Sequence, residues 1–213
     1  FNLGFGFVEV GTVTPKRQLG NPKPRIFRLE KDQALINRLG FNNHGSEIVL
    51  KRISENTPNG FLGINIGPNK ETKNKEEDYY FCLSKLSSHA GYLTINISSP
   101  NTEGLRNFHK NVEMEKLLSG INKIKKDKNI KQSLALKLSP DLNENNIGKI
   151  VELIKKYNIE GIIISNTTDG NREKLLDIKK NEKGGLSGKP LRNISTNLIK
   201  KFYKQTKGKI SII

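Results

Sequence analysis

The sequence contains one cysteine and no tryptophan, and its apolar runs are short. The single Cys82 excludes an intramolecular disulfide, and its neighbours Tyr80, Phe81 and Leu83 predict a small core side chain. No apolar run approaches the roughly 18 residues that a membrane-spanning helix needs. The histidines His44, His89 and His109 lack the spacing of metal ligands, so we expect structural or surface roles for them and no metal site.

Acidic residues are also scarce, with 21 against 37 basic residues and a formal net charge of +16. Such an excess is found in proteins that bind nucleic acid or anionic membranes, and also on the solvated surfaces of Lys- and Asn-rich proteins. The only dense basic run, residues 123–128, has no interleaved aromatic residues on which bases could stack. We therefore predict no nucleic-acid partner.

Six apolar, often β-branched runs recur along the chain, and segments with helical apolar spacing separate most of them. The predicted strands are residues 7–10, 61–66, 92–95, 134–138, 161–164 and 210–213. The predicted helices lie within residues 45–59, 76–89, 112–127 and 143–157, with a last one capped by Ser195 or Thr196. Residues 34–40 are predicted to form a short helical turn closed by Gly40. This alternation predicts an α/β fold with a parallel sheet and right-handed crossovers.

Polar residues follow the strands where each one ends. Residues 96–106 read NISSPNTEGLR, and an asparagine or lysine ends three other runs, at Asn65, Lys137 and Asn166. Any one such loop could be a turn held by Asn and Ser hydrogen bonds. Their repetition at the carboxyl ends of strands, where α/β barrels place their chemistry, instead predicts a pocket of neutral hydrogen-bonding groups and a cation. An open doubly wound sheet is the alternative fold, but no Gly-rich fingerprint follows the first strand.

Several segments together resemble one family, dihydroorotate dehydrogenase, in its class 2, quinone-dependent and membrane-associated branch. The matching segments are residues 5–15, 23–28, 37–43, 63–67, 96–106, 137–142, 165–168 and 184–188, in the order of the family. Ser99 marks the branch, because class 1 enzymes carry cysteine there. One departure is Glu103, where family members usually have proline.

The resemblance implies a TIM (β/α)8 barrel that residues 1–213 form only in part. The first strand, the end of strand 7, strand 8 and the N-terminal membrane-docking helices of the family have no counterpart in this sequence. The implied reaction is oxidation of dihydroorotate to orotate in pyrimidine synthesis, with FMN as cofactor and a quinone as acceptor. The implied location is the cytoplasmic face of a bacterial inner membrane or the mitochondrial inner membrane, reached through that N-terminal segment.

The resemblance also assigns roles to residues. Ser99 is the expected base that removes the C5 proton, and Lys137 is expected to stabilise the reduced flavin at its N1–C2=O edge. The substrate-binding residues that it implies are Asn37, Arg38, Leu39, Gly40, Phe41, Asn96, Asn101, Asn166 and Thr167. The implied flavin contacts are Thr12, Asn65, Asn96, Lys137, Ser165 and Gly188.

Two other functions are compatible with parts of the sequence. A second FMN barrel, similar to dihydrouridine synthase, would use the positive charge to hold tRNA, but those enzymes depend on a catalytic cysteine and Cys82 lies in a predicted helix. A basic, non-catalytic α/β binding module would use the strand-end amides only to cap loops.

Overall fold

A parallel sheet forms the centre of the computed structural model, which describes residues 1–102 and 104–213 and so leaves Glu103 outside. Its six strands run in the order β1-β4-β5-β6-β7-β9, and every neighbouring pair is parallel. The strands are β1 (Phe7–Val13), β4 (Phe61–Ile66), β5 (Tyr92–Asn96), β6 (Ser133–Leu138), β7 (Gly161–Ile164) and β9 (Ser211–Ile212). All six strands predicted from the sequence are confirmed.

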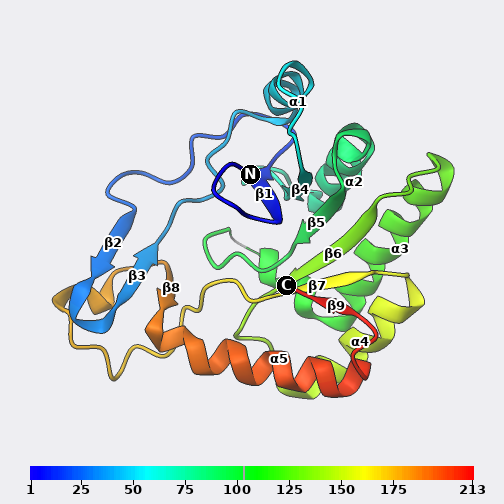
Figure 1. The fold of residues 1–213 in the computed structure, drawn as a ribbon. Coiled ribbons are helices and arrows are strands. Elements are labelled where there is room, and N and C mark those ends of the chain that lie inside the picture. Colours follow the sequence, from blue (N-terminus) through cyan, green and yellow to red (C-terminus); the bar gives the residue numbers. More distant parts are fainter. Residues whose placement is uncertain (103) are drawn as a thin grey trace.

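The helices lie on one face of this sheet and follow one another around it (Figure 1). They are α1 (Ser46–Glu55), α2 (Lys75–Leu86), α3 (Asn111–Asp127), α4 (Ile147–Lys156) and α5 (Arg192–Thr206). The predicted cap of the last helix is wrong, because α5 begins at Arg192 and the Ser195 hydroxyl donates to the Arg192 carbonyl inside it. A short 3-10 turn containing Pro190 leads into this helix, and proline is well suited to a helix start.

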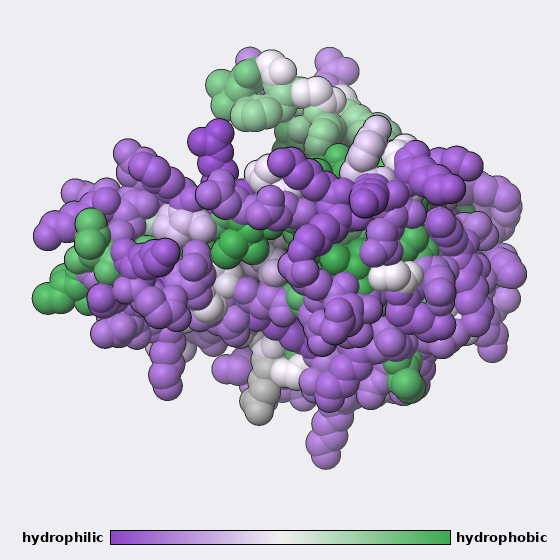
Figure 2. Space-filling view, turned by 90° about the horizontal axis from the view of Figure 1, so that it is seen from below, coloured by the Kyte–Doolittle hydropathy of each residue, from purple (hydrophilic) through white to green (hydrophobic). Residues whose placement is uncertain are grey.

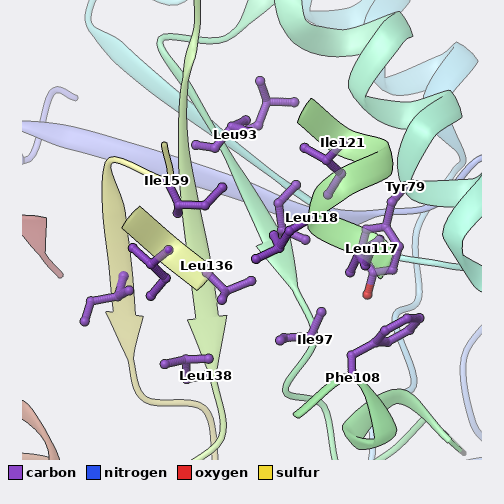
Figure 3. Close-up of a cluster of buried hydrophobic side chains, with 14 of the residues drawn as sticks. Tyr79, Leu93, Ile97, Phe108, Leu117, Leu118, Ile121, Leu136, Leu138 and Ile159 are labelled. Carbon is purple, nitrogen blue, oxygen red and sulfur yellow. The ribbon is translucent and has the colours of Figure 1, made fainter. Parts of the chain in front are cut away.

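The core lies between the sheet and these helices. In β6, Leu134, Leu136 and Leu138 are buried in this core, and Leu136 points toward Leu118 of α3 (Figure 3). Lys137 therefore projects from the opposite face, since side chains alternate along a strand. We call the face opposite the helices the inner face.

Cys82 is part of the same core. It is fully buried on α2, and burial raises the pKa of its thiol to about 12. The predicted core role of Cys82 is confirmed.

A second, antiparallel sheet of three strands extends from the carboxyl ends of β1 and β7. It consists of β2 (Ile26–Leu29), β3 (Ala34–Asn37) and β8 (Gly185–Gly188), in that order. The predicted helical turn at residues 34–40 is therefore wrong. Residues 34–37 pair with β2 on one side and with β8, distant in sequence, on the other, and local sequence patterns do not show such partners. A small core fills this sheet, made of Phe27, Leu29, Ile36, Leu175 and Leu186.

The surface seen in Figure 2 is mostly hydrophilic, with scattered apolar patches. Within the described part of the chain, no helix combines the length and the apolar character needed to cross a membrane.

Candidate active site

Three side chains form a row of hydrogen bonds across the carboxyl ends of β1, β4 and β5. The Thr12 hydroxyl donates to Asn65 Oδ1 at 2.8 Å, and Asn96 Nδ2 lies 3.0 Å from Thr12 Oγ1 and 3.2 Å from Asn65 Oδ1. Asn65 and Asn96 are 4% and 3% exposed, so these bonds form away from bulk water. Tyr79 of α2 supports the row by donating to the Asn96 carbonyl at 2.6 Å. The row provides a rigid set of neutral polar groups on the inner face.

The row continues into the loop after β5 and reaches the loop after β7. Ser98 Oγ donates to Asn96 Oδ1 at 3.0 Å, and Asn166 Nδ2 donates to Ser98 Oγ at 3.0 Å. The Thr167 backbone N–H then donates to Asn166 Oδ1 at 2.8 Å. Amides from three different strand ends are therefore joined in one network.

Ser99 lies in the same loop and is 4% exposed. Its Oγ accepts a hydrogen bond from the Asn101 backbone N–H at 3.2 Å, which leaves the hydroxyl hydrogen free to point elsewhere. Asn101 Nδ2 donates to the Asn37 carbonyl at 3.1 Å and so ties this loop to the end of β3. Thr102 is also buried, but no hydrogen bond joins it to Ser99 among the described residues.

Arg106 binds together the three loops that carry these groups. It donates to the Ser98 carbonyl at 3.3 Å and the Thr167 carbonyl at 3.1 Å, and it pairs with Asp141 at 2.9 Å and Asp169 at 2.8 Å. Asp141 follows β6, so one guanidinium connects the ends of β5, β6 and β7. Such a fork of donors suits arginine and no other side chain.

Lys137 places a second positive charge at these strand ends. It is half-buried, and its Cα pairs in register with that of Asn96 on β5. Within the described part of the chain it has no hydrogen-bond or ion-pair partner. A half-buried ammonium without an acceptor favours an anionic or carbonyl-rich ligand on the inner face. Together with the amide and hydroxyl donors beside it, this charge fits the polar edge of a flavin, which presents carbonyl oxygens and ring nitrogens.

The predicted substrate segment at residues 37–41 lies beside this edge, but its side chains diverge. Arg38 pairs with Glu182 at 2.8 Å and stacks over the Phe27 ring at 4.4 Å, so its charge is directed into the small sheet. Phe41 and Thr12 both lie against Gly67. A Cβ atom added at Gly67 would lie 2.8 Å from Thr12 Cγ2 and 3.1 Å from Phe41 Cε2, so the two side chains are close to each other.

The remaining residues of the segment are partly or fully covered. Leu39 is half-buried, and Gly40 is buried with a φ of +73°. Of the predicted flavin contacts, Ser165 donates to the Asn166 carbonyl at 3.0 Å, and Gly188 is exposed at the end of β8.

Two residues of this region were not singled out by the sequence reasoning. Glu9 projects from β1 onto the inner face, and Arg106 was seen only as the last residue of a loop. The signal for Glu9 was present, because a charged residue inside the apolar run of residues 7–10 is unusual for a buried strand. The signal for Arg106 was absent, since its partners come from loops distant in sequence.

A hollow lies at the opposite edge of the sheet, where the strands begin. It is lined largely by apolar and small residues, among them Phe7, Phe61, Tyr92, Ala135 and Gly161. It lacks the amide network, so the carboxyl edge is the candidate active site. Among the described residues, no cluster of His, Cys, Asp or Glu side chains could hold a metal ion.

His109 gives the region a testable pH dependence. Burial, with a smaller contribution from the Arg106 charge, lowers its pKa to about 4, and its Nε2 accepts from the Ser139 backbone N–H at 3.5 Å. The unfolded chain, with a histidine pKa of about 6.5, binds more protons below that pH than the folded protein does. We therefore expect the free energy of unfolding to fall by about 1–2 kcal/mol from this residue as the pH drops from about 7 to 5.

Chemical denaturation at the two pH values measures this loss. His109→Gln is the control, because glutamine can accept the same hydrogen bond without titrating, and it should remove that part of the pH dependence. An unchanged pH dependence in His109→Gln would show that His109 does not contribute.

Comparisons with known proteins agree in one family. The family model described as dihydroorotate dehydrogenase matches residues 1–213. A protein of Bartonella tribocorum named dihydroorotate dehydrogenase (quinone) is 44% identical over 217 residues, covering 100% of this chain and 60% of that protein. A protein of the same name from Chromobacterium violaceum is 43% identical, covering 99% of this chain and 63% of that protein.

The structural comparison gives the same result. A crystal structure of DHODH from Eimeria tenella in complex with ferulenol matches with a TM-score of 0.92 at 38% identity, covering 99% of this chain and 63% of that one. The chain thus spans about 60% of the length of the curated relatives it matches.

Proposed function

Because this chain belongs to the dihydroorotate dehydrogenase family, we propose that the protein oxidises dihydroorotate to orotate in pyrimidine synthesis, with FMN as cofactor and a quinone as final acceptor. The observation that supports this most is the arrangement at one edge of a parallel sheet of Ser99, the amides of Asn96, Asn101 and Asn166, and Lys137, which has no partner among the described residues. A binding module would need neither the buried Ser99 hydroxyl nor a lysine that has no partner among the described residues.

The substrate side of the site is built from neutral amides. The edge of dihydroorotate alternates N–H donors and C=O acceptors, and an asparagine amide can match either group. We assign Asn96, Asn101, Asn166 and Thr167 to this edge. Ser99 would remove the proton from C5, and its burial at 4% exposure provides the desolvated setting that a weak oxygen base needs.

The flavin side is the row of Thr12, Asn65 and Asn96, with Lys137 beside it. When bound, FMN supplies the acceptor for the hydride that leaves C6 of the substrate. Lys137 would hold its ammonium against the N1–C2=O edge and so favour the charge that this edge gains on reduction. Ser165 and Gly188 are assigned to the same cofactor from the resemblance alone.

The dihydrouridine synthase alternative is disfavoured by the position of Cys82. That chemistry needs a thiol that reaches the substrate and gives up its proton, whereas this thiol is fully buried on α2 with a pKa of about 12.

The quinone and the membrane are further parts of the proposal. We propose peripheral association with the membrane that carries the quinone, through a segment outside residues 1–213. The complete protein should then sediment with neutral phospholipid vesicles, whereas residues 1–213 alone should not. Binding of this chain only to anionic vesicles, reversed by high salt, would reflect its net charge alone.

Anaerobic reduction tests the proposed reaction. The purified protein should show the near-ultraviolet and blue absorption bands of a flavin, and dihydroorotate should bleach the blue band and yield one orotate per flavin. A protein that binds FMN but is not bleached by dihydroorotate would contradict the substrate, and a protein that binds no FMN would contradict the cofactor.

A further inference from the structure

Glu9 is a carboxylate on the inner face that neither the resemblance nor the proposed reaction uses. Its Oε2 accepts from the Thr94 hydroxyl at 2.6 Å and the Tyr92 hydroxyl at 3.0 Å, and its Oε1 accepts from Asn65 Nδ2 at 2.9 Å. No cation lies within ion-pair distance of it among the residues described. Three neutral donors from two neighbouring strands therefore hold this half-buried charge.

The bond to Asn65 has a direction that matters for the rest of the row. An ionised carboxylate can only accept, so the side of Asn65 that faces Glu9 must be its NH2 group. Asn65 Oδ1 then faces the other way, where it accepts from Thr12 Oγ1 and from Asn96 Nδ2. The opposite orientation of Asn65 would set its NH2 group against that of Asn96.

Asn96 cannot relieve such a conflict by turning over as well. Its Oδ1 accepts from the Ser98 backbone N–H at 3.3 Å and the Ser98 hydroxyl at 3.0 Å. A backbone N–H can only donate a hydrogen bond, so the group of Asn96 that faces it must be the amide oxygen. The Asn96 amide is therefore fixed by the loop after β5. The Asn65 amide is held at both ends, by Asn96 Nδ2 at its Oδ1 and by Glu9 at its NH2 group.

We propose that Glu9 is a positioning residue that acts through Asn65, and that it sets which groups of the Thr12–Asn65–Asn96 row are presented to the flavin. This inference rests on the proposed function for the identity of the ligand. The orientation of the two amides is a property of the protein without any ligand, so this part of the inference does not depend on the proposed function.

NMR of the protein without cofactor tests the orientation of the amides separately from its effect on FMN binding. In the apo-protein labelled with ¹⁵N-asparagine, the side-chain NH2 hydrogens of Asn65 should give NOEs to the γ-methylene of Glu9, and those of Asn96 should give NOEs to the Thr12 side chain. NOEs from the Asn65 NH2 group to Thr12 instead would overturn the proposal. This result is independent of whether FMN binds.

A swap of donor and acceptor tests the consequence for binding, measured by titrating the apo-proteins with FMN. Asn65→Asp alone places two carboxylates against each other and should weaken FMN binding by about 100-fold or more, the effect of losing a strong polar contact. Adding Glu9→Gln restores one donor between them, because the glutamine NH2 group can donate to the aspartate, and should recover at least about tenfold. A double variant that binds no more tightly than Asn65→Asp would overturn the proposal.

Thr94→Val is the matched control. It removes the shortest hydrogen bond to the same carboxylate but leaves the bond to Asn65, so FMN affinity should stay within about twofold of the wild type while Glu9→Gln lowers it by about tenfold. A purely structural role for Glu9 predicts equal losses in the two variants, and that outcome would overturn the proposal. If the wild type binds no FMN, the proposed function fails, and the NOE pattern alone decides the role of Glu9.

Discussion

Ser99→Ala is expected to slow the reduction of the bound flavin by dihydroorotate by roughly two to four orders of magnitude, the usual contribution of a general base. The hydroxyl is buried, and the Asn101 N–H occupies one of its lone pairs, which leaves a second lone pair to accept a proton. Alanine leaves the backbone loop and the Asn101–Asn37 hydrogen bond intact. Stopped-flow absorbance of the flavin band measures the rate, and orotate affinity should change little.

Ser98→Ala is the matched control for this prediction, because it removes a neighbouring buried hydroxyl from the same loop. Ser98 Oγ bonds Asn96 and Asn166, so its loss should weaken substrate binding more than it slows flavin reduction. Ser99→Cys should keep measurable activity that rises with pH, since a thiol must ionise before it can accept the proton. A full rate in Ser99→Ala would remove Ser99 from the role of base.

Lys137→Met is expected to lower the midpoint potential of the bound flavin. The ammonium has no partner within the part of the chain that the structure describes, and the flavin is the acceptor that we assign to it. Loss of one charge-assisted contact of about 2–3 kcal/mol corresponds to a drop of about 40–65 mV, at about 30 mV per 1.4 kcal/mol for a two-electron couple. Spectroelectrochemical titration of the holoenzyme measures this shift.

Lys131→Met provides the comparison, because Lys131 is exposed just before the same strand. It removes the same charge and adds the same side chain, so it should leave the potential unchanged. If Lys137→Met leaves the midpoint potential unchanged, Lys137 does not contact the flavin and is only one of the many surface lysines.

The strands of the parallel sheet could be predicted because the sequence pattern of each one lies within the strand and its flanking residues. Each of the six strands is a short apolar run bounded by turn residues, and helical spacing separates most of them. Side chains alternate along β6, so Lys137 lies on the face opposite Leu134, Leu136 and Leu138, which are in the helix-side core. A strand-end position was sufficient to expect Asn65, Asn96 and Asn166 near one another, as their hydrogen bonds through Ser98 show.

The small sheet and the links between loops could not be predicted in this way. Residues 34–37 are a strand only because β2 and β8 supply their hydrogen-bond partners, and β8 lies about 150 residues away in the sequence. Arg106 and Glu9 owe their roles to groups brought together by the sheet order, which single-strand patterns do not contain. Sequence reasoning therefore identified the groups at the strand ends but not the residues that hold them in place.

A crystal structure of the protein with FMN and orotate is the decisive test of the proposed site. The flavin should lie on the inner face against Thr12, Asn65 and Asn96, with Lys137 Nζ within hydrogen-bond distance of its N1–C2=O edge. Orotate should lie between the flavin and Ser99, with its ring edge on Asn96, Asn101 and Asn166. A flavin bound elsewhere, or an orotate whose C5 does not face Ser99, would contradict the proposed site.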